Sequence, residues 1–315
     1  MLNKFGIREE DLPEQFSTKT TEGRILIVDG DAACYRAAAK AAKLQTAISR
    51  FQTEIYQLQF LTKAEEVRVH ITPAGCFKRG RHLLKTYQPY QGNRKNKEKP
   101  ALLEPLRLCV HEHFYDHDNV VVIPNWDWEA DDGIMIDQYK YSDKDVLVIS
   151  EDKDLDIGPA ARYNPESGDI HRIDNRYGSI WLKETPAGAK KIRGHGTKFF
   201  WSQMLTGDSA DHIKGLIKYN GKLCGPVAAF NALELVNDES WAANLVLNAY
   251  RQIKQNPLPE GEALWLIRTP EDSFCKYLLE LDLTPTNKDF VESNYDNVII
   301  YHDLFLQLYL HRLFL

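Results

Sequence analysis

The sequence of 315 residues predicts an α/β protein with a mostly parallel central sheet flanked by helices. Short aliphatic and β-branched segments, each ending in a turn, alternate with segments whose apolar residues recur at helical spacing. Beyond Phe199 the helical periodicity dominates. We therefore expect an α/β part followed by a helical part.

The first predicted strand is Arg24–Val28, a buried aliphatic run that stops at the turn Asp29-Gly30-Asp31. The alanine-rich stretch Ala32–Leu61 has apolar residues at helical spacing and is expected to be helical. The strand pattern recurs, with helical segments in between, at Val67–Thr72, Asn119–Pro124 and Asp145–Ser150.

The sheet is expected to end in a hairpin, because Ala161–Asn164 and Ile170–Ile173 flank a Pro-Glu-Ser-Gly-Asp turn. Thr185–Thr197 is rich in Pro, Gly, Lys and His and is expected to be a loop. The apolar run Tyr301–Leu315 is expected to pack as a helix on the core, and its weak amphipathicity also allows contact with a partner. The chain then divides into a leader at 1–22, an α/β core at 23–190 and a helical region at 191–315.

The five scattered cysteines include no Cys-x-x-Cys pair, which argues against a zinc motif and indicates a reducing compartment. The first residues lack the apolar stretch of a signal peptide, and no run of about eighteen apolar residues occurs. We expect a cytoplasmic monomer with no membrane contact.

The net charge is −6, but the segment from Lys78 to Pro100 contains eight basic residues and only Glu98 as an acid. A basic segment on an acidic chain indicates a local contact with phosphate groups. Taken alone, such a segment is also compatible with a solvated surface loop.

Four acidic groups follow predicted strands or lie in the helical turns after them. They are Asp29, Glu129-Ala130-Asp131-Asp132, Asp152-Lys153-Asp154 and Asp208 with Asp211. Acids from separate strands can converge in the crevice beyond the carboxyl ends of a parallel sheet. Each group alone can be a turn former or a helix cap. Together, and without basic partners, they would repel one another unless divalent cations bind. All-oxygen ligands favour Mg²⁺ or Mn²⁺, and two such ions can hydrolyse a phosphodiester.

The order of five motifs in residues 24–233 resembles the bacteriophage branch of the flap endonuclease and 5′–3′ exonuclease family. The motifs are Val28-Asp29-Gly30, Tyr90-Gln91-Gly92-Asn93-Arg94, Glu129-Ala130-Asp131-Asp132, Ser150-Glu151-Asp152-Lys153-Asp154 and Gly207-Asp208-Ser209-Ala210-Asp211-His212-Ile213-Lys214-Gly215. The resemblance implies a PIN-like 5′ nuclease core with a helical arch at about 78–105 and a helix-hairpin-helix-type region that binds DNA.

The resemblance also implies the roles of the site residues. The first metal would be held by Asp29, Glu129 and Asp131, with Asp132 as an auxiliary acid, and the second by Asp152, Asp154, Asp208 and Asp211. Arg94 would contact the scissile phosphate and Tyr90 would stack on the terminal nucleotide, while the basic side chains of Lys95, Lys97 and Lys99 steer the 5′ strand. Duplex DNA would be gripped by a glycine-rich hairpin with Gly215, Gly221, Lys222 and Gly225, in which the family often holds a monovalent cation such as K⁺.

The chain departs from the family pattern at two places. Gln91 replaces the lysine of the Tyr-Lys-Gly-Asn-Arg motif, and the strand ending at Thr72 lacks the aspartate that usually helps to hold the first metal.

The sequence therefore predicts a Mg²⁺- or Mn²⁺-dependent nuclease that acts on DNA with a 5′ end, flap or nick, in phage primer removal, recombination or host DNA degradation. It would work in the host cytoplasm, with a replication protein as a possible partner. Two alternatives stay open at this point: a non-catalytic protein that binds DNA structures, and a PIN-like ribonuclease.

Overall fold

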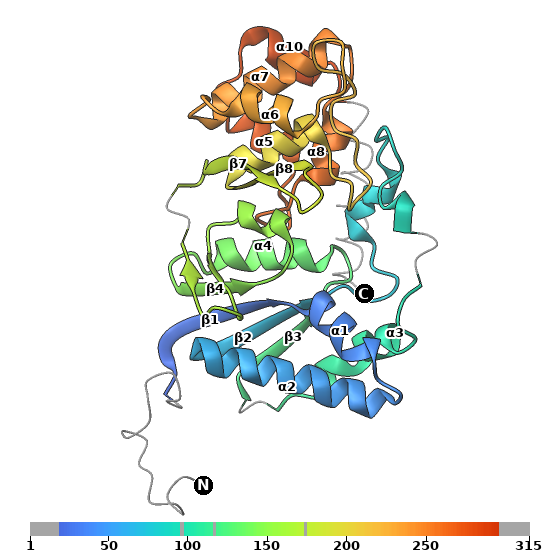
Figure 1. Cartoon of the computed structure of the whole chain (residues 1–315), viewed down its shortest axis with the longest axis vertical. Helices are drawn as coiled ribbons and strands as arrows, with labels where there is room; N and C mark the ends of the chain where they lie inside the picture. The colour runs from blue at the N-terminus through green and yellow to red at the C-terminus, as the bar shows by residue number, and fades with distance from the viewer. Residues whose placement is uncertain (1–18, 95–97, 116–117, 173–174, 296–315) are drawn as a thin grey trace, which may run out of the picture.

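The computed structural model describes residues 19–94, 98–115, 118–172 and 175–295. The predictions for Tyr301–Leu315, Lys95 and Lys97 lie outside these residues. Figure 1 shows the central sheet in the lower half of the molecule, with helices on both faces, and a helical part stacked above it. No helix in the described ranges has the length and apolar character needed to cross a membrane.

The central sheet has six strands in the order β3-β2-β1-β4-β5-β6, and only β6 runs antiparallel to its neighbour. Its strands are β1 (Thr21–Asp29), β2 (Ala64–Ile71), β3 (Val120–Pro124), β4 (Asp145–Ile149), β5 (Ala161–Tyr163) and β6 (Ile170–His171). The prediction of a mostly parallel sheet that ends in a hairpin is confirmed. β1 begins at Thr21, inside the segment expected to be a leader.

Both faces of the sheet are covered, which explains why its strands read as continuous apolar runs. In β1, Ile25 and Ile27 belong to one buried cluster, whereas Leu26 and Val28 belong to the other. The second cluster packs under the first three helices. These are α1 (Gly30–Ala39), α2 (Leu44–Thr62) and α3 (Leu103–Cys109), followed by the short turn η6 (Val110–Glu112).

The stretch Ala32–Leu61 forms two helices instead of one, with a break between Ala39 and Leu44. Alanine favours helix on both sides of this break, so the sequence carries no signal for it. α1 packs against α2 on the same face of the sheet.

The helical part comprises α5 (Thr197–Thr206), α6 (Pro226–Leu233), α7 (Glu239–Gln252), α8 (Leu258–Leu264), α9 (Phe274–Leu279) and α10 (Pro285–Glu292). Buried side chains of this helical part belong to the same apolar cluster as those of α4 (Ala130–Lys140). The cluster also includes the side chains of β1 and β4 on the face of the sheet opposite α1 and α2. Aromatic rings fill its centre, and those of Trp265 and Tyr277 stack with their centroids 4.3 Å apart. α4 is therefore the layer between the sheet and the helical part (Figure 1).

The expectation of a loop at Thr185–Thr197 is wrong, because this segment contains a strand. β7 (Ser179–Glu184) and β8 (Lys190–His195) form an antiparallel hairpin in which Trp181 pairs with Arg193. Ile192 is buried against the helical part while Lys190 and Lys191 are exposed. The exposed charged residues hide the strand signal in the sequence.

The basic segment forms two short 3-10 turns, η4 (Lys78–Leu83) and η5 (Gly92–Arg94), before α3. It runs beside the carboxyl ends of the strands, at the right of Figure 1. Another short turn, η8 (Lys153–Ile157), follows β4.

Replacing Gly133 with Ala tests how tightly α4 packs on the sheet. A Cβ atom at Gly133 would lie 2.4 Å from Nδ1 of His70, and the ring of His70 is fixed by Asp137 and Asn125. We expect Gly133→Ala to lower the free energy of unfolding by about 1–3 kcal/mol, measured by urea denaturation. At Gly225 a Cβ atom would meet nothing within 4 Å, so Gly225→Ala is the control. Equal effects of the two changes would contradict this packing.

Candidate metal centre

The predicted acids lie at one edge of the molecule, because the parallel strands all end there. Asp29 is the last residue of β1, and α4 begins directly after Glu129, beyond β3. Asp152 follows β4, and Asp208 follows α5. This edge contains the candidate metal centre.

Asp29 joins the ends of β1 and β4. Its Oδ1 caps α1 by accepting a bond from the amide of Ala32 at 3.2 Å, and its Oδ2 accepts one from the hydroxyl of Ser150 at 2.8 Å. The side chain is buried, so Asp29 is fixed in place by both contacts.

Asp131 lies among acids. Burial and the negative charges of Asp152, Asp29 and Glu129 raise the pKa of Asp131 well above its usual value. Within the described ranges its carboxylate has no hydrogen-bond or ion-pair partner. A cation placed beside this carboxyl group would stabilise its ionised form.

Asp132, its neighbour, points the other way. It is fully buried, and its two oxygens accept bonds from Arg81 at 2.6 and 2.7 Å. It also completes a capping box with Glu129, and its Oδ1 accepts a bond from the amide of Ile267 in the helical part. Arg81 thus occupies the carboxylate that the resemblance implies as an auxiliary acid, and the role of Asp132 at a metal stays a prediction.

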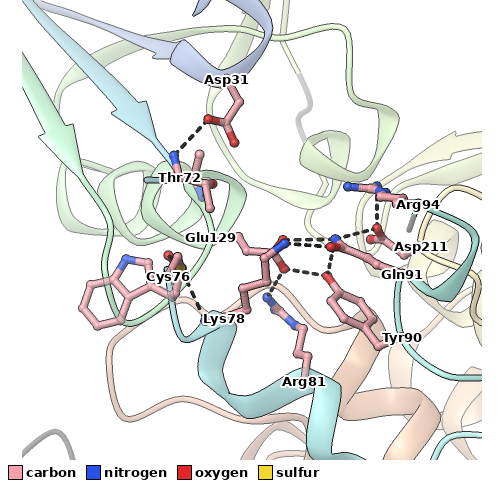
Figure 2. A network of polar contacts seen from close by, with 12 residues as sticks. Asp31, Thr72, Cys76, Lys78, Arg81, Tyr90, Gln91, Arg94, Glu129 and Asp211 are labelled. Atoms are coloured by element: carbon pink, nitrogen blue, oxygen red, sulfur yellow. Dashed lines mark hydrogen bonds and ion pairs between the residues drawn. The ribbon is translucent and has the colours of Figure 1, made fainter. Parts of the chain in front are cut away.

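Glu129 is the centre of a polar network (Figure 2). Its Oε1 accepts bonds from Lys78 at 2.8 Å and from Gln91 at 3.0 Å, and its Oε2 from Tyr90 at 2.5 Å. Burial raises the pKa of Glu129, but the charges of Arg81 and Lys78 outweigh it and hold this pKa at about 2. The expectation of acids without basic partners is therefore wrong.

A second group of acids surrounds Lys153. Its ammonium group lies 2.7 Å from Oδ1 of Asp154 and 3.0 Å from Oδ2 of Asp208. Burial and the charge of Asp152 raise the pKa of Asp154, with Lys153 opposing them. Burial also acts to raise the pKa of Asp208, but Lys153 outweighs it and lowers this pKa.

Asp211 connects this group to the basic segment. Its Oδ1 accepts bonds from Arg94 at 2.6 Å and from Gln91 at 3.1 Å, as Figure 2 shows. Burial raises the pKa of Asp211, and the charge of Arg94 opposes this. Arg94 is half-exposed, whereas the hydroxyl of Tyr90 is turned inward to Glu129.

Asp31 was not predicted as a site residue from the sequence, although it lies two positions after Asp29 in the turn Asp29-Gly30-Asp31. Its Oδ1 accepts a bond from the amide of Thr72 at 2.9 Å and pairs with Arg107 at 3.0 Å. Asp31 thus places a carboxylate beside the end of β2, the strand that lacks an aspartate (Figure 2). Burial raises its pKa.

The acids fit a hard divalent cation by their chemistry, because all of them offer carboxylate oxygens. In the present side-chain arrangement, no three Asp, Glu, His or Cys side chains of the described chain converge on one point as ligands. The ammonium groups of Lys78 and Lys153 lie on oxygens that a cation would need. The unpaired Asp131 carboxylate supports the fit, and metal binding would require both lysines to move.

The glycine-rich segment lies between α5 and α6. Gly215 and Gly221 have φ angles of 65° and 79°, which favour glycine, and Tyr219 pairs with Lys222 across the turn. Gly225 stands at the start of α6, ahead of Pro226. Lys222 is exposed, as is Lys99, which pairs with Glu104 at 3.2 Å.

No protein-family model matches the chain, and no curated protein matches it. Its fold is similar to solved structures at low sequence identity. A complex of the bacteriophage T5 flap endonuclease with DNA and metal ions has 16% identity and a TM-score of 0.47, over 89% of this chain and 99% of that chain. The T5 5′-exonuclease with bound zinc has 17% identity and a TM-score of 0.47, over 90% and 98%. The catalytic core of Rad2 in complex with DNA has 12% identity and a TM-score of 0.37, over 92% and 80%.

The two T5 structures carry the names of the class that the sequence motifs resemble, flap endonuclease and 5′-exonuclease.

Neutralising Asp131 and Asp132 separately tests their opposite roles. Asp132→Asn leaves buried Arg81 with only its longer contact to Glu129, at 3.3 Å, as a charged partner, and should lower the free energy of unfolding by about 3–5 kcal/mol. Asp131→Asn removes a repelled charge and should leave stability unchanged or raise it, because a raised pKa means that folding disfavours the ionised form. Both are measured by urea denaturation at neutral pH in EDTA. Similar losses for the two variants would contradict the assignment.

Proposed function

We propose that this protein is a divalent-metal-dependent nuclease that hydrolyses DNA phosphodiesters at or near a 5′ end. The observation that carries the proposal is the unpaired carboxylate of Asp131, which is surrounded by Asp29, Asp152 and Glu129 at the carboxyl edge of the sheet. Such a group has a physical reason to bind a cation. The order of the five motifs supports the same function.

In this proposal Asp29, Glu129 and Asp131 hold one Mg²⁺ or Mn²⁺ ion. The second is held by Asp152, Asp154, Asp208 and Asp211. Two bound ions supply a polarised water nucleophile and charge stabilisation for the leaving oxygen.

The chain's own residues hold the ligands and place the substrate. Ser150 fixes Asp29, and Gln203 donates to Oδ1 of Asp154 at 2.6 Å. In the reaction a water oxygen bonds to phosphorus and loses a proton, one P–O bond breaks, and the departing oxygen takes up a proton. The products are one phosphate monoester and one hydroxyl end.

The DNA contacts are assigned to exposed basic groups on two sides of this edge. Arg94 and Lys99 of the basic segment would contact the 5′ strand, as we also infer for Lys95 and Lys97. The turn around Gly215, Gly221 and Lys222 would contact the duplex with its backbone N–H groups, together with the start of α6 at Gly225. A K⁺ ion in this turn, monomeric action and a replication-protein partner are parts of the same proposal.

One observation favours a second candidate, a DNA-structure-binding protein without turnover: Lys78 and Lys153 neutralise carboxylates that a metal would need. The two candidates make different predictions in one assay.

A 5′-labelled flapped duplex should be cleaved in Mg²⁺ or Mn²⁺ and left intact in excess EDTA, with Ca²⁺ supporting binding but little turnover. Product sizes report whether cutting is exonucleolytic or endonucleolytic, and an RNA flap tests for ribonuclease activity. Undiminished cleavage in EDTA would exclude metal catalysis. Tight binding without cleavage in every metal would favour the non-catalytic candidate.

Lys222 tests the duplex contact. Removing one phosphate contact should reduce the slope of log affinity against log salt by about one unit, so Lys222→Ala should show this change in fluorescence anisotropy with duplex DNA. Lys288 is an exposed lysine on α10 and serves as a control of equal charge. An unchanged slope for Lys222→Ala would remove this turn from the interface.

A further inference from the structure

We propose that Lys78 is a catalytic residue whose ammonium group binds the phosphate being cleaved, an inference that rests on the proposed nuclease function. Its Nζ lies 2.7 Å from Oε1 of Gln91 and 2.8 Å from Oε1 of Glu129 (Figure 2). Its side chain is 30% exposed, so a substrate can reach it. Lys78 therefore places a cation at the border between the carboxylates and solvent.

The other basic side chains near Glu129 and the neighbouring acids are occupied by carboxylate partners. Arg81 is buried and donates two bonds to Asp132, one to the carbonyl of Trp265 and one, at 3.3 Å, to Oε2 of Glu129. Lys153 is shared by two carboxylates. Lys78 contacts one carboxylate and one neutral amide, and an ammonium group has three N–H donors. One donor is therefore free in this arrangement, and a metal ion on Oε1 of Glu129 would free the donor that this oxygen now accepts. Gln91 brings no competing charge.

The backbone presents Lys78 in a fixed position. Lys78 and Arg79 both have φ angles in the left-handed region, 52° and 53°, which residues with a side chain adopt only when their surroundings hold them. The amide of Arg79 donates to the carbonyl of Asp127 at 2.7 Å, and that of Phe77 to the carbonyl of Trp126 at 2.8 Å. Both anchors belong to the segment that leads into Glu129. Lys78 and Glu129 are therefore positioned by the same segment.

This placement suits the electrostatics of phosphodiester hydrolysis. When water attacks phosphorus, negative charge builds on the non-bridging oxygens, and a pre-positioned donor lowers the barrier by stabilising that charge. In this role Lys78 acts by charge and hydrogen bonding and transfers no proton. Its effect should appear in the rate of the chemical step more than in the affinity for DNA.

The test is single-turnover cleavage of a flapped duplex by Lys78→Ala at saturating Mg²⁺, together with DNA affinity measured in Ca²⁺. We expect the rate to fall about 100-fold and the affinity to change only a few-fold. Lys288 is an exposed lysine on α10, outside the proposed DNA contacts, and Lys288→Ala should leave the rate unchanged. Because the end of Gln91 adjoins Nζ of Lys78, the double variant Lys78→Ala/Gln91→Lys should regain at least tenfold of the lost rate.

Two results would overturn the role of Lys78 alone. One is a wild-type rate in Lys78→Ala at saturating Mg²⁺. The other is a lost rate that higher Mg²⁺ restores fully, which would make Lys78 only a support for Glu129. If the wild-type chain itself cleaves nothing in Mg²⁺ or Mn²⁺, the proposed function fails first and the role of Lys78 fails with it. Equal thermal midpoints of the variants establish that each one is folded.

Discussion

Repulsion among carboxylates at one edge of the sheet is the constraint on which the rest of this structure depends. The parallel strands bring Asp29, Asp131 and Asp152 together, and burial strengthens their mutual repulsion. Basic side chains from distant segments offset part of this repulsion. Lys78 and Arg81 lie beside Glu129, and Lys153 lies beside Asp208. In the part of the chain that the structure describes, Asp131 has no such partner, and it is there that a divalent cation has the strongest reason to bind.

The first turn of α4 connects this edge to the interior. Glu129 and Asp131 face the acids, whereas Asp132 faces inward to Arg81. Arg81 in turn donates to the carbonyl of Trp265, whose ring stacks on Tyr277 in the helical part. The position of the carboxylates proposed to bind metal therefore depends on the packing of three layers, and not on the local turn alone.

Much of the fold and part of the site could be predicted from the sequence, for physical reasons that particular residues show. β1 and β4 are aliphatic because both faces of the sheet are buried, and acids that follow such strands must meet at one edge. β8 was not predicted as a strand because its exposed residues are charged. The pairing of Arg81 with Asp132 spans 51 positions and depends on a turn with three left-handed residues, which no periodicity reveals. The contact of Asp31 with Thr72 joins two strand ends and was equally hidden.

The central claim is that this edge binds divalent cations through two sets of carboxylates. The most direct measurement is a titration of the wild-type chain with Mn²⁺ in the absence of DNA, with free ion followed by electron paramagnetic resonance. The account predicts two ions per chain, one of them lost in Asp131→Asn and the other in Asp154→Asn. Absence of Mn²⁺ binding at millimolar concentration, or the same stoichiometry in all three proteins, would contradict it.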